Sequence, residues 1–382
     1  MSKLPDNFKF EKPIYVTSPA LPPLEEMNEL LKDIWESKWL TNNGKYHQAL
    51  EKALCEYLGV KYISLFSNGT LALITALQAL KITGEVITTP FSFVATTHAL
   101  WWNNIKPVFV DIEPETFNLD PEKIEASITP QTTAILPVHV YGNPCNVKRI
   151  KEIADAYGLK VIYDACHTFN VRINDVPVLN FGDLSVMSFH ATKVYTTFEG
   201  GAIVCHDEAT KKRIDYLKNF GFANETSVVA PGINAKMNEF QAALGLLQLK
   251  YINSYVSKRK QLYNNYQEQL NTVACISFPE SLDNISNCYS YMPIILNKID
   301  TVNTSSYRDT IYSRLKNINI FCRRYFYPLI SQFPSYKGLD SSNQLNLKTA
   351  ISISNKVLCL PLFPDLSMED LNLISNSLKR VL

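Results

Sequence analysis

The chain has 382 residues, of which 46% are hydrophobic and 19% are charged, and its formal net charge is +1. This length exceeds the size at which one hydrophobic core keeps growing, so we expect two domains. The composition is that of an ordinary globular protein, which excludes a disordered or fibrous chain. A net charge near zero gives no electrostatic reason to expect nucleic acid or a membrane surface as a partner.

The eight cysteines are scattered, without a Cys-x-x-Cys pair and without a metal-ligand spacing to the six histidines. We therefore expect reduced cysteines and no metal site. The segment from Met1 to Lys12 is polar and lacks the apolar core of a signal peptide. No stretch approaches the roughly 20 apolar residues of a membrane span. These features predict a soluble protein of the cytoplasm.

Short apolar runs alternate with helix-like stretches between Tyr62 and Cys205. This pattern predicts a mainly parallel sheet covered by helices, an α/β fold. Polar residues with catalytic potential follow the predicted strands, where ligands of open α/β sheets bind. The predicted strands are 62–66, 85–89, 107–110, 133–138, 160–163, 184–189 and 202–205, and the helices among them include 71–80, 94–102 and 147–157.

The pattern and composition of the sequence change after Gly232. Apolar residues at helical spacing predict one long helix from Asn238 to about Leu270. The last third is polar and rich in Asn and Ser, with strands predicted near 291–296 and 319–322, a loop at 301–306 and a terminal helix near 368–382. We predict a large ligand-binding domain of residues 1–250 and a smaller α+β domain of residues 251–382.

The run Ser67-Asn68-Gly69-Thr70 lies between a predicted strand and the helix that begins near Leu71. Backbone N–H groups at a helix N-terminus bind phosphate, with a stabilisation of roughly 0.3 to 2 kcal/mol per charge. A simple capped turn explains the same residues, because Ser and Thr are preferred N-caps and Gly suits tight turns. Phe93 follows the next strand, where it either stacks on an aromatic ligand or belongs to the core.

Asp164 and Lys193 form the most informative pair in the sequence. Asp164 ends an apolar strand, and Lys193 follows the next one in the run Ser188-Phe189-His190-Ala191-Thr192-Lys193. A lysine amine can form a Schiff base with the aldehyde of pyridoxal phosphate, and a buried carboxylate can hold the pyridine ring protonated so that it accepts electrons. Alone, the two residues could be a surface lysine and a capping or metal-binding aspartate. Together they predict a pyridoxal phosphate site.

Residues beside this pair extend the predicted site. Ser188 can reach the cofactor phosphate, and the turn Glu199-Gly200-Gly201 leaves Glu199 available to the substrate. We expect His139 and His190 to be structural.

These motifs together resemble the DegT/DnrJ/EryC1/StrS family of sugar aminotransferases, which have the aspartate aminotransferase-type fold, fold type I. The resemblance runs from about Pro19 to Pro328. It is strongest in Ser67–Thr70, 137–142, Tyr163–His167, Ser188–Lys193 and Glu199–Ile203.

The resemblance implies a role for each residue of the cofactor site. Lys193 is the Schiff-base lysine, Asp164 is the partner of the pyridine nitrogen, and Phe93 is the stacking ring. His167 stands beside the cofactor 3'-oxygen, where many members have Gln, and its charge state stays open. The phosphate is held by Gly69, Thr70 and Ser188.

The resemblance also implies partners. Asn234 corresponds to a position that reaches the cofactor phosphate of the neighbouring subunit, which implies a homodimer with shared active sites. Arg324 and Tyr327 lie in the stretch that corresponds to a substrate-facing segment of the small domain. With Glu199 they are the candidates for contact with the nucleotide or the amino donor.

The sequence around Lys193 and in Trp35–Gly44 most resembles members that aminate C4 of dTDP-4-dehydro-6-deoxy-D-glucose, with L-glutamate as donor, to give dTDP-4-amino-4,6-dideoxy-D-glucose. Another nucleotide keto-sugar, a C3 or galacto product, and a non-catalytic regulator stay open. Lys193 disfavours the dehydratase branch of the family, which has histidine there. The lack of a Gly-x-Gly-x-x-Gly turn after the first strand disfavours a nucleotide-dependent oxidoreductase.

Overall fold

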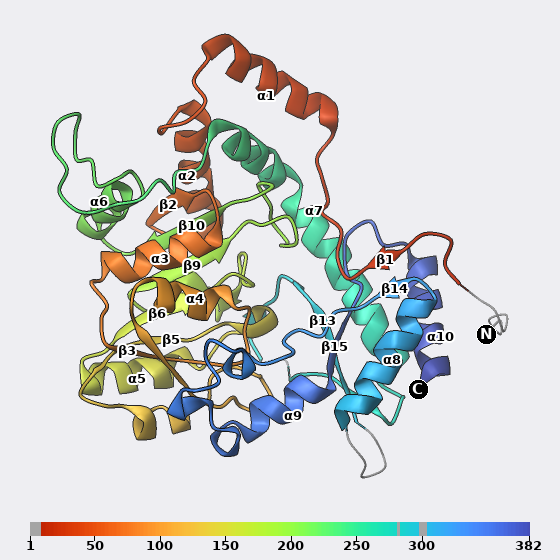
Figure 1. Cartoon of the computed structure of the whole chain (residues 1–382). Helices are drawn as coiled ribbons and strands as arrows, with labels where there is room; N and C mark the ends of the chain where they lie inside the picture. The colour runs from red at the N-terminus through yellow and green to blue at the C-terminus, as the bar shows by residue number, and fades with distance from the viewer. Residues whose placement is uncertain (1–8, 281–282, 298–303) are drawn as a thin grey trace.

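The computed structural model describes residues 9–280, 283–297 and 304–382. Its centre is a seven-stranded sheet with helices on both faces (Figure 1). The strand β10 runs antiparallel to both of its neighbours, and the other neighbouring strands are parallel. The predicted mainly parallel α/β sheet is therefore confirmed. In spatial order the strands are β2 (Tyr62–Phe66), β10 (Gly201–Cys205), β9 (Leu184–Ser188), β6 (Lys160–Asp164), β5 (Thr132–Leu136), β3 (Glu85–Thr88) and β4 (Lys106–Phe109).

The sheet is buried on both faces, which explains why its strands are continuous apolar runs. Successive side chains of a strand point to opposite faces. In β10, Ala202 and Val204 join one core cluster, whereas Ile203 and Cys205 join another.

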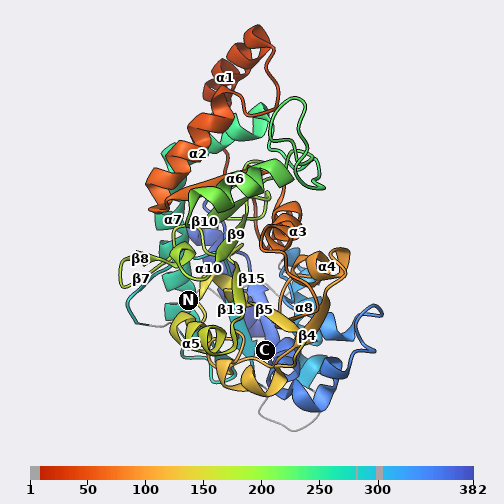
Figure 2. The ribbon, with the colours of Figure 1, turned by 90° about the vertical axis from the view of Figure 1, so that its left-hand side faces the viewer.

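Helices cover each face of the sheet. One face packs against α2 (Lys45–Leu58), α5 (Val147–Tyr157) and the start of α7 (Glu239–Leu270), and α1 (Leu24–Ser37) lies on α7. The other face packs against α3 (Gly69–Ala79), α4 (Ala95–Trp102) and α6 (Glu208–Leu217). Figure 2 shows α1 at the outer edge of the molecule, beyond α2.

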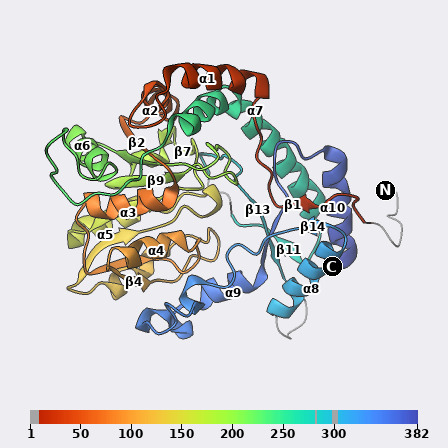
Figure 3. The same cartoon turned by 45° about the horizontal axis from the view of Figure 1, so that its top comes forward.

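The long helix α7 joins the sheet to a smaller C-terminal unit (Figure 3). Its first turns belong to the core under the sheet, and its last turns belong to a separate cluster with α8 (Thr304–Asn317) and α10 (Met368–Val381). The strands β11 (Ile276–Ser277), β13 (Met292–Leu296) and β15 (Val357–Leu360) form a sheet in this unit, with α9 (Lys348–Lys356) beside it.

The N-terminal segment also belongs to the smaller unit, because β1 (Ile14–Tyr15) pairs with β14 (Ile320–Phe321). The division at residue 250 stays a prediction. The remaining short strands β7 (Arg172–Ile173), β8 (Val176–Pro177) and β12 (Ile285–Ser286) form a small sheet of their own.

Most predicted elements agree with the structure to within one or two residues, and 62–66 and 147–157 agree at both ends. The expectation of a loop at 301–306 is wrong from Thr304, where α8 begins, because Ser and Thr are also common at helix starts. Residues 301–303 lie outside the described part of the chain. Within the described residues, no helix combines the length and apolar character that crossing a bilayer requires.

Candidate active site

A pocket of about 230 Å³ opens at the carboxyl ends of the parallel strands. It brings together eight of the residues predicted from sequence, which arrive from four separate segments of the chain. They are Gly69, Thr70, Phe93, Asp164, His167, Ser188, Lys193 and Glu199.

Lys193 lies in the loop that follows β9, and its backbone N–H donates to the carbonyl of His190 at 2.9 Å. Its side chain is partly buried and lines the pocket. Among the residues that the structure describes, no acidic side chain forms an ion pair with the Lys193 amine. This amine is therefore available for chemistry in the pocket.

Asp164 ends β6 with its side chain 5% exposed. Its backbone is fixed on both sides, since its N–H donates to Pro137 and its carbonyl accepts from the N–H of His139. Its carboxylate accepts the N–H of Cys166 at 3.2 Å and the hydroxyl of Thr96 at 2.8 Å. A buried negative charge held in this way suits a cationic ring nitrogen.

His167 is held as a neutral hydrogen-bond donor. Its Nδ1 accepts the backbone N–H of Tyr141 at 3.3 Å, so the ring proton lies on Nε2. Burial lowers the pKa of His167 well below its ordinary value, and the positive charge of Lys193 acts in the same direction. The ring stacks against Phe326 and meets the edge of Tyr291. The charge state that the sequence left open is thus neutral at physiological pH.

The first turn of α3 forms the other end of the pocket. Asn68 caps the helix by accepting the N–H of Leu71, which leaves the N–H groups of Gly69 and Thr70 at the open helix terminus. A Cβ on Gly69 would lie 3.0 Å from Cβ of Ser188, and a Cβ on Gly201 would lie 2.7 Å from the backbone of Asn68. These close approaches place Ser188 beside the helix terminus, where both can hold an anion.

Phe93 is not a core residue. The residue is 58% exposed and lines the pocket, so the core alternative for this position is wrong. His190 also lies at the pocket, with its ring Nε2 3.5 Å from Glu199, whereas His139 is fully buried and stacks on Tyr163.

Three predicted residues lie outside the lining of the pocket. Asn234 is exposed, and its side-chain oxygen accepts from the Lys236 amine at 2.8 Å. Arg324 pairs with Asp309 at 3.0 Å and lies over the ring of Tyr327. Tyr325 and Phe326, which lie between Arg324 and Tyr327 in the chain, line the pocket instead.

Sequence reasoning missed several residues that line the pocket, among them Ser92, Thr96, Tyr291, Tyr325 and Phe326. Ser92 and Thr96 follow a strand that was already recognised, and this placement was a usable signal. Tyr291 and Tyr325 come from the smaller unit, and no local pattern connects them to Lys193.

The pocket suits pyridoxal phosphate in each of its parts. Lys193 supplies an amine for the aldehyde, Asp164 a carboxylate for the ring nitrogen, and the α3 terminus with Ser188 a cradle for the phosphate. The fold and this site define a pyridoxal phosphate enzyme of fold type I, with the chemistry of an aminotransferase.

The chain belongs to the DegT/DnrJ/EryC1/StrS aminotransferase family, whose profile matches residues 24–379. A protein of Shigella dysenteriae is 52% identical over 97% of this chain and 100% of its own length, and one of Escherichia coli is 54% identical over 94% and 96%. Both are named dTDP-4-amino-4,6-dideoxy-D-glucose transaminase.

Solved structures agree with this assignment. DesI, crystallised in the presence of its TDP-sugar product, superposes with a TM-score of 0.92 at 32% identity and covers 98% of this chain and 94% of its own. NtdA from Bacillus subtilis, with bound cofactor PMP, gives a TM-score of 0.84 at 30% identity, over 94% of this chain and 81% of its own. The predicted family, fold, aminotransferase class and pyridoxal phosphate cofactor are confirmed.

Proposed function

We propose that this protein transfers the amino group of L-glutamate to C4 of dTDP-4-dehydro-6-deoxy-D-glucose, giving dTDP-4-amino-4,6-dideoxy-D-glucose. The observation that carries the proposal is the meeting of Lys193, Asp164 and the α3 terminus in one pocket. The choice of sugar is supported by two relatives with this named activity that are more than half identical over nearly the whole chain.

Each side chain of the pocket has a proposed task. Lys193 holds the cofactor through its Nζ and, once released, carries a proton at that atom between carbon centres. Asp164 keeps the ring nitrogen protonated, and His167 donates from Nε2 to the 3'-oxygen. The cofactor supplies an aldehyde that takes up the amino group and a ring that accepts electrons.

The remaining contacts orient the ligands. The N–H groups of Gly69 and Thr70 and the Ser188 hydroxyl hold the phosphate, and Phe93 covers the ring. Glu199, exposed at the mouth beside His190, is placed to meet the substrate. The contacts of Arg324 and Tyr327 are with each other and with neighbours in the smaller unit, so their role toward the substrate stays a prediction.

The sugar assignment is tested by incubating the purified protein with glutamate and a panel of nucleotide keto-sugars. The panel includes 4-keto and 3-keto sugars on dTDP. It also includes a GDP-linked 4-keto sugar, because a GDP-perosamine synthase of Escherichia coli O157:H7 is 32% identical to this chain. We expect a single product by mass and NMR, aminated at C4 with the gluco configuration. Preferred turnover of another sugar would overturn the assignment.

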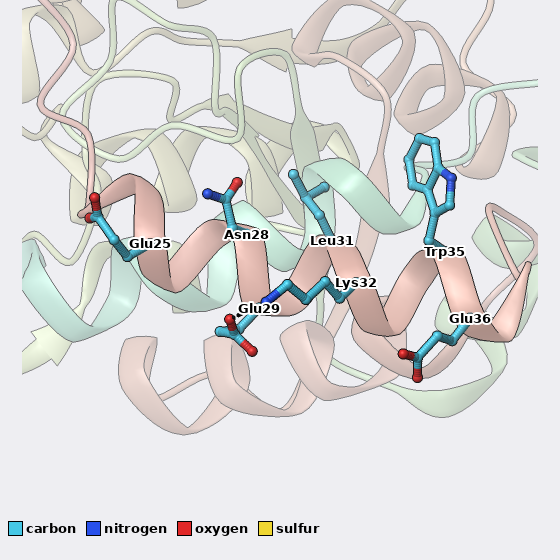
Figure 4. Close-up of a pocket in the computed structure, with 7 residues that line it drawn as sticks. All are labelled: Glu25, Asn28, Glu29, Leu31, Lys32, Trp35 and Glu36. Carbon is cyan, nitrogen blue, oxygen red and sulfur yellow. Dashed lines mark hydrogen bonds and ion pairs between the residues drawn. The ribbon is translucent and has the colours of Figure 1, made fainter.

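We also propose a homodimer with shared active sites. Large apolar side chains are exposed around α1 and in the segment before α7, including Trp35 at 69%, Trp39 at 57% and Val229 at 58%. Figure 4 shows Asn28, Leu31 and Trp35 on one side of α1, and Glu29 and Glu36 on the other. An exposed apolar surface of this kind favours a protein interface, and Asn234 lies near it in the sequence.

Mixing two inactive variants tests the shared site. Lys193→Ala and Asn234→Ala chains, unfolded and refolded together in equal amounts, form mixed dimers in which one of the two sites has both native residues. We expect activity to return to about a quarter of the native level, as random pairing of two chains gives. No recovery, with each variant alone also inactive, would place both residues in the same subunit's site.

A further inference from the structure

Two buried hydroxyl groups at the wall of the pocket are linked to the carboxylate of Asp164. The Oγ1 of Thr96, on α4, lies 2.8 Å from Oδ2 of Asp164, and the Oγ of Ser92 lies 2.8 Å from Oγ1 of Thr96. Thr96 is 0% exposed and Ser92 is 4% exposed. The three side chains therefore form a chain of hydrogen bonds that is almost completely buried at the wall of the pocket.

The direction of these hydrogen bonds follows from the chemistry of the groups. An ionised carboxylate only accepts, so Thr96 uses its single hydroxyl proton for Asp164. Thr96 can then only accept from Ser92, which makes Ser92 the donor to Thr96. The other carboxylate oxygen accepts the N–H of Cys166. Both oxygens of Asp164 are thus oriented by a donor from the protein.

We propose that Thr96 is a positioning residue that acts through Asp164, and that Ser92 acts one step farther back. A donated hydrogen bond stabilises the charged form of a carboxylate. Thr96 therefore holds Asp164 as an anion in a fixed orientation and favours the proton on the ring nitrogen of the cofactor. This inference rests on the proposed function, in which Asp164 faces that nitrogen.

The neighbouring residue provides a matched control. Thr97 lies on the same helix and is also 0% exposed, but within the described residues its hydroxyl has no hydrogen-bond partner. Thr97→Val and Thr96→Val remove the same hydroxyl from the same helix. Only Thr96→Val removes a donor from Asp164.

The first measurement is the affinity of the cofactor-free protein for pyridoxal phosphate, followed by protein fluorescence. We expect Thr96→Val to weaken binding about tenfold, the change expected on losing a hydrogen bond to a charged group. Ser92→Ala should weaken it about two- to threefold, because it acts through Thr96. Thr96→Ser, which keeps the hydroxyl, should bind pyridoxal phosphate with an affinity within about twofold of the native protein. The control Thr97→Val should also stay within this range.

A cofactor analogue with carbon in place of the ring nitrogen, 1-deazapyridoxal phosphate, separates positioning from packing. If Thr96 acts through Asp164 and the ring nitrogen, Thr96→Val should lower the affinity for this analogue by less than about twofold. An equal loss with both cofactors, or an equal loss in Thr97→Val, would overturn the proposal.

The pH dependence of the visible absorbance of the cofactor-loaded protein gives a second readout. Loss of the hydrogen bond that Thr96 donates to Asp164 moves the proton away from the ring nitrogen. We therefore expect Thr96→Val to shift the midpoint of the pH-dependent absorbance change to higher pH. An unchanged midpoint would contradict the proposal. Neither readout uses turnover or a sugar, so these results are distinguishable from a failure of the proposed sugar assignment.

Discussion

The inner wall of the pocket, at Asp164 and His167, and its outer rim, at Thr70, Phe93 and Glu199, differ in how far their residues are buried. On the inner wall, Asp164 and His167 are buried and each has hydrogen-bond partners from the same chain. On the rim, Phe93, Thr70 and Glu199 are exposed. The inner wall is therefore preorganised by contacts within the chain, whereas the rim stays exposed for contacts with ligands.

This difference separates two kinds of residue by the effect of their loss. Residues of the inner wall set charge and proton position, and their loss changes the chemistry. Residues of the rim contribute contact area, and their loss changes affinity by smaller amounts. Loss of a charge on the inner wall and loss of an aromatic ring on the rim test this division directly.

Replacing the buried charge should have the largest effect. We expect Asp164→Asn to lower kcat by about 10² to 10³, the range seen when a preorganised electrostatic contact is removed from an active site. Asp155→Asn, which removes an exposed carboxylate on α5, is the control and should leave kcat unchanged. Steady-state kinetics with saturating cofactor measure both. A loss of less than about threefold in Asp164→Asn would show that the inner wall does not act through charge.

Acid should destabilise the protein through its buried histidines. Burial lowers the pKa of His139 to about 3. Below about pH 6.5 the unfolded chain binds a proton there that the native chain does not, so stability is complete above that pH and falls as the pH drops toward 3. The loss at pH 5 is about 2 kcal/mol for one such histidine.

Urea unfolding at pH 7 and pH 5 measures this loss. His139→Gln is expected to be less sensitive to the change of pH than the native protein, even if it is less stable at both values. The exposed His206 provides the control, because His206→Gln should keep the native sensitivity. Equal sensitivity of His139→Gln and the native protein would mean that folding does not lower the pKa of His139.

Loss of the rim aromatic should have the smallest effect. Stacking contributes about 0.5 to 1.5 kcal/mol, so Phe93→Ala should weaken cofactor binding about two- to tenfold and leave the pH dependence of turnover unchanged. Phe198, which is 49% exposed but does not line the pocket, is the matched control. A larger loss of kcat in Phe93→Ala than in Asp164→Asn would reverse the division between wall and rim.

The sequence predicted the central sheet because each strand is buried on both faces and therefore stands out as a short apolar run. It predicted the residues that follow these strands, since parallel strands bring their carboxyl ends to one edge. Lys193, Asp164 and Gly69 lie far apart in the chain, yet this rule alone places them together. The chemistry of Lys193 and Asp164 predicted their roles directly. The roles of His167, Asn234, Arg324 and Tyr327 came from the family resemblance.

Other features depend on contacts between distant segments, which no local pattern encodes. The hydrogen bond from Thr96 to Asp164 joins residues 68 positions apart. The side chains of Tyr291 and Tyr325 reach the pocket only because the smaller unit packs against the sheet. The pairing of Arg324 with Asp309 likewise depends on how α8 meets the segment after β14. Such contacts are set by packing, so the sequence predicted the large-unit side of the site better than the other side.

The central claim is that Lys193 is the residue that carries the cofactor. Borohydride reduction of the protein loaded with pyridoxal phosphate converts a Schiff base into a stable secondary amine, and peptide mass spectrometry then locates it. We predict one modified site, Lys193, and no modification in Lys193→Ala. A modified peptide that contains a different lysine, or equal labelling of the Lys193→Ala variant, would contradict this account.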